Sequence, residues 1–75
     1  MQAKIMLYGT ACCHLCEDAE AILRQLNVDA VHVDIADDDG LLEKYGVRIP
    51  VLKRMDTNAE LGWPFDAAEV TRFLL

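Results

Sequence analysis

The sequence predicts an α/β domain in the order strand, helix, strand, short helix, two strands and a final helix. Hydrophobic residues switch between short strand-like runs and helical spacing along the chain, and turn or capping residues fall at the borders of these segments. The 75 residues suffice for one domain, residues 1–75. A strand-helix-strand start predicts two parallel strands joined by a right-handed crossover, and the later pair of strands extends that sheet antiparallel.

The first two elements are a buried strand and an amphipathic helix. Residues 3–9 form a short apolar run that ends at Gly9, which is typical of a buried strand. Residues 15–26 then place apolar side chains at helical spacing and polar side chains opposite them. Asn27 follows the last turn, where it fits a left-handed helix cap.

The middle of the chain predicts a second strand and a short helix. Residues 30–36 alternate, with Val31, Val33 and Ile35 on one face, so we expect a half-buried strand. His32 falls on the polar face with Asp34, and we interpret it as a solvated strand residue, not a ligand. Residues 37–46 open with capping aspartates and close at a glycine, which favours a short helix.

The last third of the chain predicts a hairpin followed by a helix. Residues 47–55 and 59–63 are extended segments separated by the turn-forming sequence Asp-Thr-Asn. Within residues 65–75, Asp66 and Glu69 have the spacing of a capping box at a helix start. We expect Trp63 and Phe65 to seal this helix against the core.

Charge and hydropathy exclude several classes of partner. The net charge of −6, from 13 acidic and 7 basic residues, is unfavourable for nucleic-acid binding, which needs clustered Lys and Arg. No apolar run approaches membrane-spanning length, and the first ten residues lack the apolar core of a signal peptide. We therefore expect a cytoplasmic protein without a membrane or nucleic-acid partner, in a compartment where structural disulfides are rare.

The cysteines are the strongest functional signal. All three lie within residues 12–16, so they have no distant cysteine with which to staple the fold. Cys13 and Cys16 are three residues apart, and at the start of a helix this spacing brings their sulfurs to the same side. The free backbone N–H groups and the positive end of the helix dipole favour a thiolate there. We expect Cys13, nearer the helix start, to be the nucleophile and Cys16 to be the resolving thiol.

Several features together resemble a known superfamily. They are the βαβαββα order, the Cys13-His14-Leu15-Cys16 dithiol after the first strand, and the sequence Arg-Ile-Pro-Val-Leu at 48–52. In these features the chain resembles the thioredoxin-like superfamily, and in size it is closest to glutaredoxins. Residues 7–23 and 60–66 resemble the small bacterial glutaredoxin-like proteins, and the resemblance covers essentially the whole chain. It implies a four-stranded mixed sheet with helices on both faces.

The resemblance also implies roles for residues outside the dithiol. It makes Pro50 a cis-proline opposite the dithiol and gives Ile49 a backbone contact with the incoming sulfur-bearing chain. Arg48 could pair with a carboxylate and Asp66 with an ammonium group of glutathione, a possible co-substrate. Against glutathione, residues 62–64 carry Trp and Pro where glutaredoxins have a second glycine.

His14 replaces the proline that usually follows the first cysteine of a glutaredoxin. A protonated His14 would tune the site by stabilising the Cys13 thiolate, whereas the negative charges of Glu17 and Asp18 would disfavour that thiolate. These effects oppose each other, and the sequence leaves their net sign open.

The sequence thus predicts a thiol-disulfide oxidoreductase of cell redox homeostasis. We expect a monomer without metal or organic cofactor that acts on a disulfide-bearing protein or on glutathione; its reductant stays open. One alternative is a soft-metal protein in which Cys12, Cys13, His14 and Cys16 bind zinc or copper. Another is a redox-inactive interaction module. The metal chaperones with this cysteine spacing have a βαββαβ order, which differs from the predicted final helix. We interpret Cys12 as a bystander more readily than as a second reactive thiol.

Overall fold

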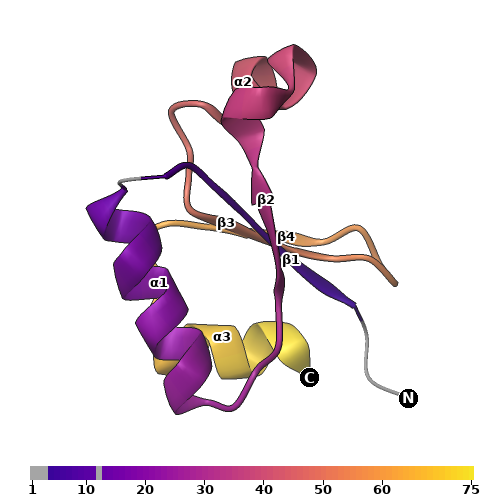
Figure 1. Cartoon of the computed structure of the whole chain (residues 1–75). Helices are drawn as coiled ribbons and strands as arrows, with labels where there is room; N and C mark the ends of the chain where they lie inside the picture. The colour runs from indigo at the N-terminus through magenta and orange to yellow at the C-terminus, as the bar shows by residue number, and fades with distance from the viewer. Residues whose placement is uncertain (1–3, 12) are drawn as a thin grey trace.

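A four-stranded mixed sheet forms the centre of the protein, in the order β2-β1-β3-β4 (Figure 1). This computed structural model describes residues 4–11 and 13–75. The helices and strands are β1 (Ile5–Gly9), α1 (His14–Gln25), β2 (Val31–Asp34), the short 3₁₀ helix η1 (Ile35–Asp37), α2 (Asp39–Tyr45), β3 (Val51–Arg54), β4 (Glu60–Gly62) and α3 (Ala67–Leu74). The predicted order of strands and helices is therefore confirmed.

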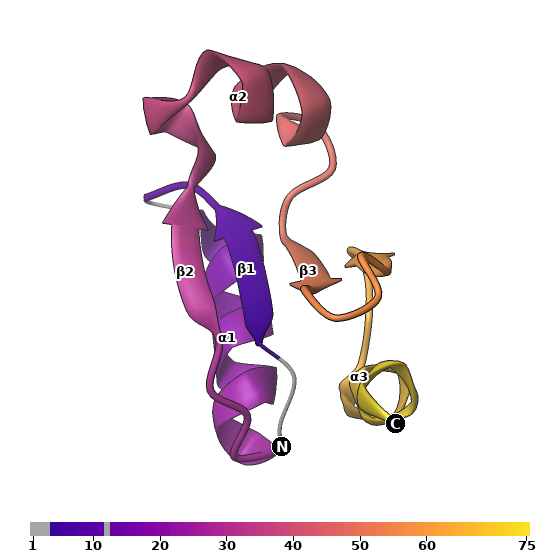
Figure 2. The same cartoon turned by 90° about the vertical axis from the view of Figure 1, so that its right-hand side faces the viewer.

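The strand pairing follows the prediction. β1 runs parallel to β2 and antiparallel to β3, and β4 continues the sheet antiparallel to β3, as the arrows in Figure 2 show for the first three strands. Tyr8 of β1 pairs with Val33 on one side and with Val51 on the other. The carboxyl ends of β1 and β2 and the start of β3 consequently lie at the same end of the sheet, where α1 also begins.

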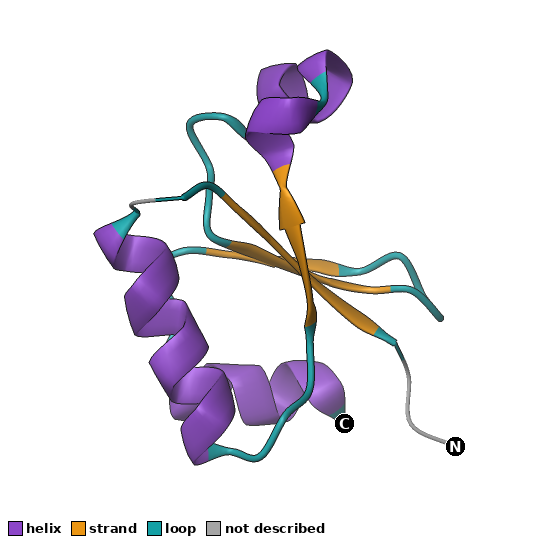
Figure 3. Cartoon of the chain, in the orientation of Figure 1, coloured by secondary structure: helices purple, strands orange, loops and turns teal. Residues whose placement is uncertain are grey.

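Helices cover both faces of the sheet, as predicted (Figure 3). α1 and α3 lie on one face, where their side chains enclose the larger core cluster of Ile5, Leu7, Ala19, Leu23, Leu52, Phe65 and Val70. α2 belongs to the opposite face, where Tyr45 packs with Tyr8, Ile35 and Val51. The rings of Tyr8 and Tyr45 are stacked, with centroids 4.7 Å apart. Among the residues described, no helix is both long enough and apolar enough to cross a membrane.

β2 is shorter and more exposed than the alternating pattern predicts. It ends at Asp34, whose Oδ1 accepts a hydrogen bond of 2.9 Å from the Ala36 amide and so caps η1. Ile35 is fully buried, but in η1, whereas Val31 in the strand is 45% exposed. The expectation of one half-buried strand over residues 30–36 was wrong because β2 is an edge strand whose end bends into a helical turn.

His32 is a solvated strand residue, as predicted, with a side chain that is 57% exposed. In the parallel register His32 pairs with Leu7, whose side chain lies in the core beneath α1. Paired residues of neighbouring strands point to the same face of a sheet. The imidazole therefore faces α1, where its Nδ1 lies 2.8 Å from Oε1 of Glu20.

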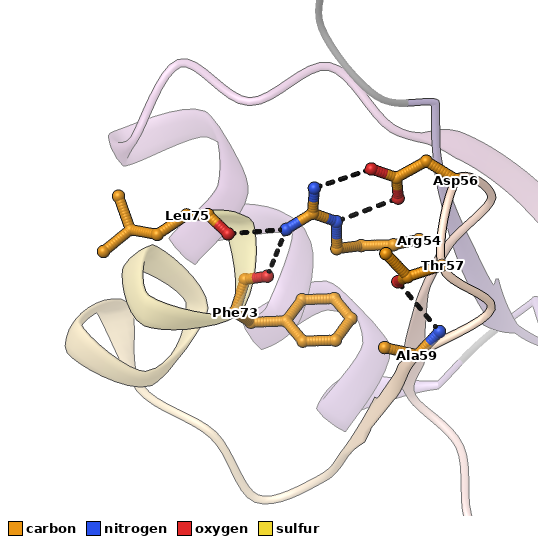
Figure 4. Close-up of polar contacts among 6 residues, drawn as sticks. All are labelled: Arg54, Asp56, Thr57, Ala59, Phe73 and Leu75. Atoms are coloured by element: carbon orange, nitrogen blue, oxygen red, sulfur yellow. Dashed lines mark hydrogen bonds and ion pairs between the residues drawn. The ribbon is translucent and has the colours of Figure 1, made fainter.

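Arg54 of β3 holds the carboxyl end of α3 (Figure 4). Its Nη1 donates to the carbonyl oxygens of Phe73 and Leu75, both at 2.9 Å. Its Nε and Nη2 donate to the two carboxylate oxygens of Asp56, at 3.0 and 2.8 Å. One guanidinium thus links the β3–β4 turn to the last helix. A lysine could not make this fork of contacts.

The local expectations at the borders of the other helices are confirmed. Asn27 has a φ of 57°, the left-handed conformation expected for it after α1. At the start of α3, Oδ1 of Asp66 accepts from the Glu69 amide at 2.8 Å. Phe65 is buried and meets Trp63 edge to face, with centroids 4.9 Å apart, so the two aromatic rings seal this helix as expected.

Candidate active site

The dithiol lies at the amino end of α1, directly after β1. Cys13 is the N-cap residue, with extended backbone angles, and its carbonyl accepts from the Glu17 amide at 3.0 Å. The Cys16 amide donates to Sγ of Cys13 at 3.2 Å. The helix begins at His14, one residue before the predicted start. Cys13 therefore caps the helix, whereas we expected it within the first turn. Its sulfur consequently replaces the oxygen of an ordinary capping side chain.

Cys16 is the protected thiol of the pair. It is 7% exposed and packs beneath the first turn, whereas Cys13 is only partly buried. Burial raises the pKa of the Cys16 thiol to about 11, and the hydrogen bond with Cys13 adds to this effect. Cys16 is therefore a neutral thiol at physiological pH.

Gly9, the last residue of β1, makes room for this buried sulfur. A Cβ atom at Gly9 would lie 2.8 Å from Sγ of Cys16, closer than side-chain atoms approach each other. The glycine that ends the predicted strand therefore has a second role, because a side chain at this position would displace the Cys16 sulfur.

Pro50 precedes β3 at the same end of the sheet. Because Tyr8 pairs with Val51 in an antiparallel ladder, Pro50 lies beside the end of β1 that leads to the dithiol. The Ile49–Pro50 peptide bond is cis, and the Pro50 carbonyl accepts from the Trp63 amide at 3.1 Å. The Ile49 amide already donates to the Tyr45 carbonyl, so a backbone bond from Ile49 to another chain would use its carbonyl oxygen.

Arg48 belongs to a group of charges that the sequence analysis did not identify. Its Nη2 lies 3.3 Å from Oε1 of Glu60, and its guanidinium lies over the Tyr45 ring at 5.5 Å. Lys44 approaches the other carboxylate oxygen of Glu60 at 3.9 Å. Arg48, for which a glutathione carboxylate was the expected partner, thus has a carboxylate partner within the protein. Glu60 offered no local signal, because it lies on β4, far from Arg48 in sequence.

The hydroxyl of Tyr45 completes this group. It donates to Oε2 of Glu60 from a ring that is almost fully buried. The Tyr45 hydrogen bond lowers the pKa of Glu60, and the cations Lys44 and Arg48 add to this shift. Burial, followed by the bond to Glu60, raises the pKa of Tyr45. The group therefore consists of a neutral tyrosine and an ionised carboxylate at physiological pH.

His14 and Asp66, two further predicted site residues, have partners within their own helices. The His14 side chain is 96% exposed, and its Nδ1 lies 3.6 Å from Oε2 of Glu17. The carboxylate of Asp66 caps α3 through the Glu69 amide, as described above. The imidazole of His14 thus lies beside Glu17, one of the two acids expected to oppose its effect on the Cys13 thiolate.

A cavity of about 230 Å³ lies next to Cys16. Its ionisable lining comes from Cys16 and Glu20 of α1 and from His32 and Asp34 of β2, and Gly9 contributes to its wall. The sequence analysis assigned Glu20 to the outer face of the helix and His32 to solvent. The spacing of four residues from Cys16 to Glu20, which places both on one side of a helix, was the signal that could have identified the cavity.

Comparison with known proteins decides the family. Residues 4–75 match the family described as "Glutaredoxin-like domain (DUF836)". The chain belongs to this glutaredoxin-like family. A comparison with curated proteins finds no match.

Solved structures agree with this assignment. The glutaredoxin-like chain is 39% identical to the Northeast Structural Genomics target protein XcR50 from X. campestris, with 93% of each chain covered and a TM-score of 0.87. It is 29% identical to protein Ne2328 from Nitrosomonas europaea, covering 100% of this chain and 94% of that one, with a TM-score of 0.85.

A more distant match establishes the superfamily fold. Trichomonas vaginalis thioredoxin is 22% identical, with 96% of this chain and 73% of that chain covered and a TM-score of 0.51. At this identity the likeness concerns the fold alone. The predicted thioredoxin-like class, and the glutaredoxin-like resemblance within it, are confirmed.

The metal alternative concerns residues that the structure describes only in part. Within 4–11 and 13–75, no three His, Cys, Asp or Glu side chains are grouped so that they could hold a metal ion. Cys12 lies outside the described residues, and with it the interpretations of that cysteine as a bystander, a second reactive thiol or a metal ligand.

Proposed function

We propose that this glutaredoxin-like protein catalyses thiol-disulfide exchange, with Cys13 as the nucleophile and Cys16 as the resolving thiol. The observation that carries the proposal is the hydrogen bond from the Cys16 amide to Sγ of Cys13 at the N-cap of α1. It holds a partly accessible sulfur at the positive end of a helix and places a buried second thiol one turn behind it.

The proposed reaction has two exchanges. The Cys13 thiolate attacks one sulfur of the substrate disulfide, a Cys13–substrate disulfide forms, and the other substrate sulfur leaves as a thiolate that takes up a proton. Cys16 then loses its proton and attacks Sγ of Cys13. The Cys13–Cys16 disulfide forms, the second substrate thiolate leaves, and two electrons have passed from the dithiol to the substrate. Two equivalents of an external thiol then reduce the Cys13–Cys16 disulfide by the same two exchanges, and they leave as a disulfide.

The surroundings of the dithiol favour a disulfide-bearing protein as the substrate. Leu15 within the dithiol motif and Val47 before the cis-proline are both exposed apolar side chains, and Val47 is fully exposed. A macromolecular partner could bury these apolar side chains when its disulfide reaches Cys13. Arg48, the cation expected to hold a glutathione carboxylate, is already paired with Glu60. Free thiols such as those of Cys13 and Cys16 are maintained in a reducing compartment such as the cytoplasm.

A redox titration tests the proposal. The purified protein is equilibrated in glutathione buffers of graded potential, and free thiols are counted after acid quenching. We expect a reversible two-electron couple that is absent in Cys13→Ser and in Cys16→Ser and is retained in Cys12→Ser. Turnover of a small protein disulfide by the same variants, with dithiothreitol as the reductant, gives the catalytic readout.

Two outcomes would overturn the proposal. One is the persistence of the couple in Cys13→Ser, which would assign it to other thiols. The other is stoichiometric zinc or copper retained through purification in a protein without a reversible couple, which would favour the soft-metal alternative.

A further inference from the structure

The cavity next to Cys16 is lined by this buried thiol and by two side chains that can accept a proton, those of Glu20 and His32. Cys16 and Glu20 are four residues apart on α1 and both line it, and His32 enters from β2. Nδ1 of His32 lies 2.8 Å from Oε1 of Glu20. Their side chains are 57% and 29% exposed, so the pair connects the cavity to solvent while Cys16 stays buried.

The proposed reaction requires a proton acceptor at this position. Burial is the largest cause of the raised pKa of Cys16 and persists in the mixed disulfide, so only a small fraction of this thiol is thiolate at neutral pH. The thiol must therefore be deprotonated as it attacks Cys13, and Cys13 itself is then bound to the substrate and cannot accept the proton. Resolution without a nearby acceptor would depend on the scarce thiolate alone.

We propose that Glu20 and His32 together accept the proton of the Cys16 thiol during resolution of the mixed disulfide. This inference rests on the proposed function. The proton passes from Sγ of Cys16 into the cavity and onto the Glu20–His32 pair, and the Cys16 thiolate attacks Sγ of Cys13. The Cys13–substrate bond breaks, the Cys13–Cys16 bond forms, and the pair later returns the proton to solvent. The cavity has room for water to carry the proton, since a liquid water molecule occupies about 30 Å³.

Among the described residues 4–11 and 13–75, the other groups around the cavity leave this pair as the acceptor. β1 and the residues after it contribute Leu7, Gly9, Thr10 and Ala11, none of which has an ionisable side chain. β2 also contributes Asp34, but its carboxylate is bonded to the Ala36 amide and caps η1. α1 contributes only Cys16 and Glu20.

Electrostatics gives the proposal a sharp test. The negative charge of Glu20 raises the pKa of Cys16, so removing that charge makes the thiolate more abundant. If Glu20 acted on Cys16 only through its charge, Glu20→Gln would speed resolution. If Glu20 accepts the proton, Glu20→Gln slows resolution. The two roles therefore predict changes of opposite sign.

The experiment is stopped-flow reduction of 5,5′-dithiobis(2-nitrobenzoate) by the fully reduced protein in a Cys12→Ser background. The first release of thionitrobenzoate reports attack by Cys13, and the second reports resolution by Cys16. At neutral pH we expect Glu20→Gln and His32→Gln to slow the second phase roughly a hundredfold, the lower end of general-base effects, without slowing the first. The deficit should shrink as pH rises, because hydroxide then removes the proton.

The controls separate chemistry from structure. Glu43→Gln removes one carboxylate charge from α2, outside the cavity, and should leave both phases unchanged. His32→Ala leaves space for free imidazole, which should restore the second phase in proportion to its concentration. Because His32 is half exposed, its variants test the proposal even if Glu20→Gln does not fold.

A second phase that is unchanged or faster in Glu20→Gln and His32→Gln would overturn this inference while leaving the exchange reaction intact. Loss of the first phase on Cys13→Ser is what the proposed function itself requires. A first phase that persists in Cys13→Ser would overturn the proposed function instead, so the two failures are distinguishable.

Discussion

Gly9 at the end of β1 lies directly against Cys16 of α1, so that a Cβ atom on Gly9 would approach the Cys16 sulfur to 2.8 Å. The strand therefore ends in the one residue type that allows the buried thiol to sit beneath the first turn of the helix. The position of the Cys16 sulfur depends on this contact as much as on the spacing between Cys13 and Cys16.

Gly9→Ala should displace Cys16 and destabilise the fold. Overpacking of this kind costs about 1 to 3 kcal/mol, which urea unfolding would measure. The second phase of the thionitrobenzoate assay should slow as well, because Cys16 would no longer face Cys13. Gly62→Ala is the matched control, since a Cβ there would have no heavy atom within 4 Å. Equal stability of the two variants would contradict the steric argument.

Cys16 should ionise only at high pH in the native protein. Its alkylation by iodoacetamide, resolved by mass spectrometry, should rise towards a midpoint near pH 11, whereas the urea-unfolded chain should follow the ordinary value of 9.0. In Cys13→Ser the midpoint should stay above 9.0, because burial is the largest cause of the shift. A native midpoint at the unfolded value would show that the thiol is not buried.

The same pKa shift predicts an alkaline loss of stability. The folded pKa of Cys16 is above the unfolded one, so the contribution of the protonated thiol is complete below pH 9.0 and is lost as pH rises towards about 11. Cys16→Ala should show a weaker decline of unfolding free energy over this range. Parallel declines in both proteins would assign the alkaline effect to other groups.

Tyr45 and Glu60 should make the fold sensitive to acid. Because the folded pKa of Glu60 is lowered, its contribution is present above the unfolded value of 4.5 and is lost as pH falls through the folded one. Tyr45→Phe should cost about 1.5 to 3 kcal/mol at neutral pH, the range for a hydrogen bond to a charged group. The difference from the unsubstituted protein should shrink in acid, as measured by urea unfolding.

Tyr8→Phe is the control for this prediction. It removes the other hydroxyl of the stacked pair and leaves the bond from Tyr45 to Glu60 in place. Its unfolding free energy should show the same acid dependence as the unsubstituted protein. If Tyr45→Phe also retained that dependence, Lys44 and Arg48 would be the source of the Glu60 shift.

Arg54 should determine how tightly the last turn of α3 is held. Arg54→Lys keeps the positive charge but cannot reach both carbonyl oxygens and the Asp56 carboxylate together. We expect faster hydrogen exchange in the last turn of α3, with little change at the amides of β1. Lys53→Arg, on the neighbouring residue of the same strand, is the charge-matched control. Uniform acceleration across the whole chain would instead indicate global destabilisation.

The sequence by itself determined the order of strands and helices, the dithiol at the start of α1 and the caps at Asn27 and Asp66. Each depends on interactions within a few residues, such as helical spacing, a left-handed turn or a side chain bonded to an amide three residues ahead. Cys13 caps α1 and so lies one position before the first turn, in which we expected it.

Only the tertiary structure decided which of these elements meet. The pairing of His32 with Glu20 required β2 to lie beside β1 in one particular register, and that of Arg48 with Glu60 required β4 to join β3. Periodicity assigns residues to one face of an element but does not say what that face will contact. For this reason the pairs His32–Glu20 and Arg48–Glu60 became visible only when the strands that carry them lay side by side.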